Sequence, residues 1–108
     1  MIEYPARRGP KRPPMHPGVL LRDDVLPALG KDKKEIARLL GVTSQTLHNI
    51  LRGKQPVTAA MALRLGKLCG NGPTLWLNLQ RDVDLWQQKR RLSKAIERIP
   101  TLHAHHVG

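Results

Sequence analysis

Apolar residues recur at intervals of three and four through most of the chain, and no stretch alternates apolar and polar residues as a β-strand does. This spacing collects apolar side chains on one face of a helix, so the sequence predicts an all-α fold. Glycine, proline and capping residues divide the pattern into five helices. We predict them from Pro17 to about Leu26, between Asp32 and Gly41, between Thr43 and Gly53, between Thr58 and Gly70, and from Pro73 to about Ile99, the last with or without a break.

The limits of the first two helices follow from their terminal residues. Pro17 can open the first helix because its missing N–H has no partner at that position, and Pro27 and Gly30 should end it. Asp32 followed by Glu35 has the spacing of a capping box, which starts the second helix. The inward faces are expected to carry Val19, Leu20 and Val25 in the first helix and Ile36, Ala37, Leu39 and Leu40 in the second.

Residues 33–52 place two short helices on either side of a tight turn and resemble the helix-turn-helix of phage-repressor-type regulators. Ala37 occupies the small-residue position where the helices touch, and Gly41 occupies the turn. An α-helical hairpin without a DNA role is the alternative, but it leaves unexplained the polar residues at the front of the second helix. The five apolar positions of the motif are Ile36, Leu40, Val42, Leu47 and Ile50.

The start of the second motif helix carries short polar side chains suited to base edges in the major groove. Gln45 and Asn49 can each form two hydrogen bonds with an adenine, and Thr46 can instead touch a thymine methyl group. The predicted base-contacting residues are Ser44, Gln45, Thr46 and Asn49.

The net charge of +11 and the pI near 11.0 indicate a polyanionic partner such as double-stranded DNA. Residues at both ends of the motif are placed to contact phosphates, which set affinity and register without reading sequence. The predicted phosphate-contacting residues are Lys33, Lys34, Thr43, Arg52 and Lys54.

The chain is short enough to form one domain, which we place at residues 17–99. Residues 1–16 combine prolines with arginine and lysine, which predicts a flexible basic arm that either follows DNA or only aids solubility. Residues 100–108 are predicted to form a flexible tail. In the last helix Trp76 is expected in the core. Leu79, Val83 and Trp86 are assigned to a homodimer interface, with core packing as the alternative.

Beyond the motif, the chain resembles the HigA/VapI-type antitoxins. The resemblance rests on His16-Pro17-Gly18, Ala62-Leu63-Arg64-Leu65 and Trp76-Leu77-Asn78-Leu79-Gln80, which occur in order within residues 15–86. It implies a homodimer that represses its own operon at a pseudo-palindromic operator and neutralises a small HigB-like mRNA-cleaving toxin. A stand-alone repressor without a toxin partner is the alternative, and it accounts better for the strongly basic charge.

Enzymatic chemistry has little support in the sequence. Asp23 and Asp24 suit a solvated helix face, and no nucleophile-base pair or glycine-rich phosphate loop is present, so we predict no catalysis and no cofactor. A ribonuclease that uses the histidines is a weaker hypothesis than a DNA-binding protein. Small RNA-cleaving toxins are expected to be α/β proteins, and no strand is predicted here. Cys69 is the single cysteine, and without a signal peptide or a long apolar run we expect a cytoplasmic protein that binds no membrane. His103, His105 and His106 lack an acidic or cysteine partner, so no metal site is predicted.

Overall fold

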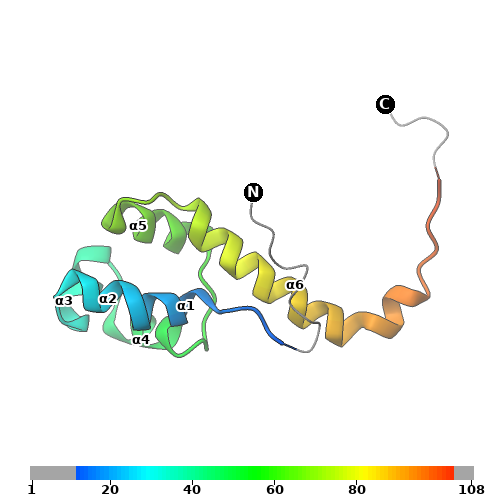
Figure 1. The fold of residues 1–108 in the computed structure, drawn as a ribbon, viewed down its shortest axis with the longest axis horizontal. Helices are drawn as coiled ribbons and strands as arrows, with labels where there is room; N and C mark the ends of the chain where they lie inside the picture. Colours follow the sequence, from blue (N-terminus) through cyan, green and yellow to red (C-terminus); the bar gives the residue numbers. More distant parts are fainter. Residues whose placement is uncertain (1–11, 104–108) are drawn as a thin grey trace.

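Residues 12–103, which the computed structural model describes, form helices and turns and no strand (Figure 1). Three of the segments are contiguous and together make one helix from residue 17 to residue 29, so the predicted all-α arrangement of five helices is confirmed. The segments are α1 (Pro17–Leu20), η2 (Leu21–Val25), α2 (Leu26–Leu29), α3 (Lys33–Leu40), α4 (Ser44–Leu51), α5 (Ala59–Cys69) and α6 (Thr74–Glu97).

The first helix passes through Pro27, so its predicted end near Leu26 is wrong. The segment η2 is a π-helix, and the N–H of Leu26 donates to the carbonyl oxygen of Leu21, five residues back. In a regular α-helix a proline ring clashes with the carbonyl four residues before it, and the wider π turn relieves that clash. The helix therefore continues to Leu29 and ends at Gly30, whose φ is 68°.

The inward face of this helix also differs from the prediction. Leu21 and Leu26 are buried, at 0% and 7% exposure, whereas Val19, Leu20 and Val25 are only half-buried. The π turn adds a residue between successive hydrogen-bonded positions, which changes the register of the apolar face. In α3, Leu39 is 44% exposed because it lies at the edge of the helix packing.

Side-chain caps begin the next three helices at the predicted residues. Asp32 accepts a hydrogen bond from the N–H of Glu35, Thr43 from that of Thr46, and Thr58 from that of Met61. Each cap satisfies one backbone donor that the first turn leaves free and is worth about 1 kcal/mol. Trp76 is fully buried, as predicted. The core consists of Leu21, Leu26, Ile36, Ala37, Leu40, Leu47, Ile50, Leu51, Val57, Met61, Ala62, Leu65 and Trp76.

The helix α6 runs unbroken over its 24 residues and extends past the other helices (Figure 1). Its first half packs against α5, while residues 87–103 are all exposed. No helix within residues 12–103 combines the length and the apolar character needed to cross a bilayer. The predicted N-terminal arm lies mostly outside the described residues, as does the tail from residue 104 onward.

Candidate nucleic-acid interface

The helix α4 is held on the core by one face, which leaves its polar face toward solvent. Leu47, Ile50 and Leu51 are buried, at 1%, 1% and 3% exposure. Ser44 and Gln45, in the first turn of the helix, are exposed. The helix therefore presents short polar side chains at its N-terminal end, as a recognition helix requires.

Two of the predicted base-contacting residues are already paired with each other. The side-chain amide nitrogen of Gln45 donates to Oδ1 of Asn49 at 3.1 Å, one helical turn away. Asn49 is half-buried, so its side chain lies partly against the helix surface. The pairing leaves the Gln45 amide oxygen and the Asn49 amide N–H groups available, which together offer an acceptor and donors to base edges.

Thr46, the fourth predicted base contact, has its hydroxyl engaged within the protein. The hydroxyl of Thr43 donates to Oγ1 of Thr46 at 3.0 Å, and Thr43 Oγ1 accepts from the Thr46 N–H at 3.0 Å. Thr46 is half-buried while Thr43 is exposed. These contacts fix the first turn of α4.

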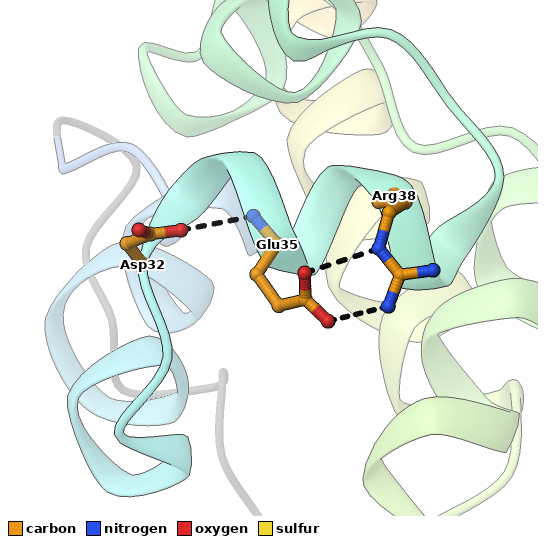
Figure 2. A network of polar contacts seen from close by, with 3 residues as sticks. All are labelled: Asp32, Glu35 and Arg38. Atoms are coloured by element: carbon orange, nitrogen blue, oxygen red, sulfur yellow. Dashed lines mark hydrogen bonds and ion pairs between the residues drawn. The ribbon is translucent and has the colours of Figure 1, made fainter.

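The start of α3 carries a polar network of Asp32, Glu35 and Arg38, in which Arg38 neutralises the Glu35 carboxylate (Figure 2). Asp32 Oδ1 accepts from the Glu35 N–H at 3.0 Å, and Arg38 forms two hydrogen bonds with the Glu35 carboxylate at 3.0 and 2.6 Å. The hydrogen bond from Arg38 lowers the pKa of Glu35. The capping box predicted here is therefore half formed, because Glu35 binds Arg38 instead of returning to the backbone N–H of Asp32.

Lysines crowd the same end of α3. Lys33 and Lys34 are exposed, and within residues 12–103 neither takes part in an ion pair. They line a hollow of about 550 Å³ together with Lys31 and Arg22, two cations that the sequence analysis did not select. Clustering of lysines around residue 32 was the signal that could have identified Lys31.

Two further cations lie just after the C-terminal end of α4. Arg52 and Lys54 are exposed, and the Arg52 guanidinium lies 3.5 Å from the ring of His48. The backbone N–H of Lys54 donates to the Asn49 carbonyl oxygen at 2.9 Å, which ties the turn after α4 to the helix. The polar face of α4 is thus flanked by exposed cations at both ends of the helix-turn-helix.

The three residues assigned to a dimer interface differ in exposure. Val83 is 6% exposed within a single chain, which favours the core alternative for that residue. Leu79 and Trp86 are half-buried, and the guanidinium of Arg90 lies 4.8 Å from the centre of the Trp86 ring.

The sequence analysis missed a second apolar row at the end of α6, here called the distal row, although its spacing of four and three residues is typical of one helix face. These side chains lie beyond the part of α6 that packs on the bundle, so a single chain leaves them uncovered. The distal row comprises Leu92 and Ile96 of α6 and Ile99 just after the helix, at 38%, 49% and 66% exposure.

Residues 12–103 contain no group of three or more histidine, cysteine or acidic side chains that could hold a metal ion. His105 and His106 lie outside the described residues. Cys69 is half-buried, and burial raises the pKa of its thiol, so the reactive thiolate is disfavoured at neutral pH.

This arrangement of helices and polar residues is similar to that of known DNA-binding proteins. The sequence profile of a helix-turn-helix domain family matches residues 18–76. Antitoxin HigA-1 of Vibrio cholerae serotype O1 is 37% identical over 84 residues, which cover 78% of this chain and 79% of the relative. Antitoxin GraA superimposes with a TM-score of 0.77 at 37% identity, covering 84% of this chain and 99% of its own.

A further solved structure, Pseudomonas aeruginosa antitoxin HigA with the higBA promoter, superimposes with a TM-score of 0.76 at 33% identity, covering 83% of this chain and 99% of its own. The fold and the polar face of α4 define a helix-turn-helix protein. The chain belongs to the HigA-type antitoxin family, as the sequence resemblance predicted. This family comprises antitoxins and regulators rather than enzymes.

Proposed function

We propose that the chain is a sequence-specific DNA-binding antitoxin of a type II toxin-antitoxin system. In this proposal two copies bind a pseudo-palindromic operator and repress their own operon, and the protein also neutralises a small HigB-like mRNA-cleaving toxin in the cytoplasm. The observation that carries the DNA-binding half is the exposed polar face at the start of α4, with cations at both ends. The relative solved with its promoter supports it.

Base reading is assigned to the N-terminal half of α4. Gln45 and Asn49 carry the main discrimination, since an amide can form two hydrogen bonds with an adenine. Ser44 is exposed at the first position of the helix and can bond either a base edge or a phosphate. Thr46, whose hydroxyl accepts from Thr43, is left to contact a thymine through its methyl group.

Phosphate contacts are assigned to the two ends of the motif. Lys33 and Lys34 start α3, Thr43 caps α4, and Arg52 and Lys54 follow α4. Cations at both ends would hold the helix along the groove and set its register on the duplex. Dimerisation is assigned to Leu79 and Trp86 of α6, while the burial of Val83 leaves it little surface to contribute.

The experiment that tests this function measures growth and repression in the same cells. The small open reading frame beside this gene is expressed with and without the protein, and growth rescue and co-purification are scored together with a promoter reporter. Rescue, a stable complex and repression are expected. A neighbour that is harmless, or toxic without rescue, would overturn the antitoxin half.

A matched variant separates the two halves of the proposal. The double substitution Gln45→Ala and Asn49→Ala changes the exposed polar face of α4 and leaves the buried face intact. This variant is expected to lose repression and to keep growth rescue. Loss of both would show that the same surface carries both activities.

A stand-alone repressor remains the second candidate, and the net charge of +11 favours it. A small RNA-cleaving toxin is itself expected to be basic, so a basic antitoxin opposes the association electrostatically. Repression without any toxic neighbour would establish this second candidate.

A further inference from the structure

The segment His16-Pro17-Gly18 fastens the start of α1 to the end of the recognition helix α4. His16 caps α1, because its Nδ1 accepts a hydrogen bond from the Gly18 N–H at 2.9 Å. Gly18 is buried directly against the Ile50 carbonyl, and a Cβ at this glycine would overlap that oxygen. The backbones of the two helices therefore touch at this point.

The His16 ring also lies near the turn that follows α4. Its Cγ and Cδ2 atoms lie 3.8 Å from the position that a Cβ of Gly53 would occupy. Gly53 has a φ of 73° and lies between Arg52 and Lys54, the two cations assigned to phosphate contacts. The ring therefore holds Gly18, whose backbone packs on the end of α4, and lies beside the turn that follows it.

The third element near the ring is α6, and it contributes Asp84. The Asp84 carboxylate raises the pKa of His16, but burial of the ring is the larger cause and lowers the pKa below its ordinary value. Asp84 on α6 is the charged group that acts on the ring, and Arg52 and Lys54 flank Gly53 in the chain.

We propose that His16 is a positioning residue for operator binding: its neutral ring holds the start of α1 on the end of α4, and protonation of the ring releases this contact and weakens binding. The proposal rests on the operator binding proposed above and adds a pH-dependent control of it. Both ring nitrogens of an imidazolium are donors, so a protonated His16 cannot accept from the Gly18 N–H. The cap is then lost.

The direction of the pH effect follows from burial. Because burial disfavours the charged ring in the folded protein, the contact is complete above the ordinary histidine pKa and is lost as the pH falls through the lowered value. Loss of one cap corresponds to about a fivefold change in an equilibrium constant. Asp84→Asn removes the carboxylate charge that favours the protonated ring, so it should move the loss of the His16 contact to lower pH.

The test measures operator affinity by fluorescence anisotropy between about pH 8 and about pH 5.5 at fixed ionic strength. The proteins are compared in a His48→Gln background, because His48 is a second histidine and lies on α4 itself. His16→Asn is the conservative variant, since asparagine can cap a helix and does not titrate. His16→Ala removes the cap at every pH.

With His16 present, affinity is expected to fall by up to about fivefold as the pH passes below the lowered pKa of the ring. His16→Asn should bind within about twofold of it at the higher pH and show no such loss, and His16→Ala should be about fivefold weaker throughout. If affinity fell equally with pH in the proteins with and without His16→Asn, the role of His16 would be overturned and the proposed operator binding would stand. Absence of operator binding at every pH would overturn both the role of His16 and the proposed operator binding.

A second measurement covers the case in which the His16→Asn variant does not fold. In the unmodified protein, the backbone amide signals of Gly18 and Gly53 are followed by NMR as the pH is lowered. They are expected to shift together with the titration of the His16 ring. Amide signals that stay fixed while the ring titrates would overturn the positioning role.

Discussion

At the residue scale, the polar side chain of Gln80 is buried where α6 meets the loop before α5. Its Oε1 accepts from the Val57 N–H at 2.8 Å, and its Nε2 donates to Asp84 Oδ1 at 2.9 Å. Val57 and Gln80 are 2% and 7% exposed, so water does not readily replace either partner. The hydrogen bond from the Val57 N–H to Gln80 satisfies a backbone donor that would otherwise be buried without a partner.

Replacing Gln80 with leucine is expected to lower the free energy of unfolding by about 1–3 kcal/mol, because the Val57 N–H then stays buried without a partner. Urea denaturation of the purified protein measures the loss. Gln88→Leu is the matched control on the exposed part of α6 and should change stability by less than about 0.5 kcal/mol. Equal effects at the two positions would contradict the explanation.

The Gln45–Asn49 pair makes a second prediction at this scale. Gln45→Ala and Asn49→Ala should each weaken operator binding by about 1–3 kcal/mol, since each removes hydrogen bonds to a base. The double variant should lose less than the sum, because the two side chains already bond each other at 3.1 Å. Anisotropy titrations of the unmodified protein, the two single variants and the double variant complete a double-mutant cycle. Gln87→Ala on α6 is the control and should keep full affinity. Strict additivity would show that the pair acts as two independent contacts.

At the scale of elements, the recognition helix is short and depends on its cap. The helix α4 has eight residues, and helices of this length form only with help from caps and tertiary packing. Thr43→Ala should therefore cost about 1 kcal/mol of stability. Thermal unfolding of Thr43→Ala beside Thr43→Ser tests this, since serine keeps the capping oxygen. If both variants lost stability equally, the lost methyl packing would explain the change and the cap would not.

The helix limits that the sequence predicted correctly are those set by local chemistry. Asp32, Thr43 and Thr58 cap helices because a side-chain oxygen three residues before a backbone N–H needs no tertiary partner to find it. The end of the first helix was wrong because Pro27 is an exception to a local rule. A π turn relieves its clash, and that turn depends on how Leu21 and Leu26 pack into the core.

The sequence also predicted part of the candidate interface, namely the part that depends on one helix alone. Exposure of Ser44 and Gln45 follows from the burial of Leu47 and Ile50 on the opposite face of the same helix. The close approach of Gly18 to the Ile50 carbonyl could not be read from the sequence, because it joins residues that only the fold brings together. Leu39 was misplaced for a related reason, since its exposure depends on which helix covers that edge of α3.

At the scale of the whole molecule, the net charge of +11 should make DNA binding strongly dependent on salt. If each subunit makes about four phosphate contacts, a dimer should give a slope of about −7 for the logarithm of affinity against that of salt concentration. Lys33→Gln should make the slope shallower by about 2 for the two copies. Titrations at several potassium chloride concentrations measure both values. A slope of about −2 would mean that most of the basic charge lies away from DNA.

The geometry of operator reading also limits where two copies can meet. Two recognition helices must be held about 34 Å apart to enter successive major grooves, so the dimer contact has to lie close to the bundle that carries α4. Leu79 and Trp86 are half-buried and meet this condition, whereas Leu92 and Ile96 belong to residues 87–103, which are all exposed. The end of α6 extends away from the bundle (Figure 1). Contact through the distal row alone would leave the spacing of the two α4 helices poorly fixed.

Trp86→Glu is therefore expected to weaken dimerisation at least about tenfold and to reduce operator binding with it, because it places a charge in an interface that excludes water. Leu92→Glu should change dimerisation and operator binding much less. Sedimentation equilibrium gives the dimer constant, and anisotropy on a full operator and on a half-site gives the coupling. The half-site affinity should be equal for the two variants, since neither change touches α4. If Leu92→Glu separated the copies and Trp86→Glu did not, the interface would lie on the distal row, and a contact beyond the bundle would then have to fix the spacing.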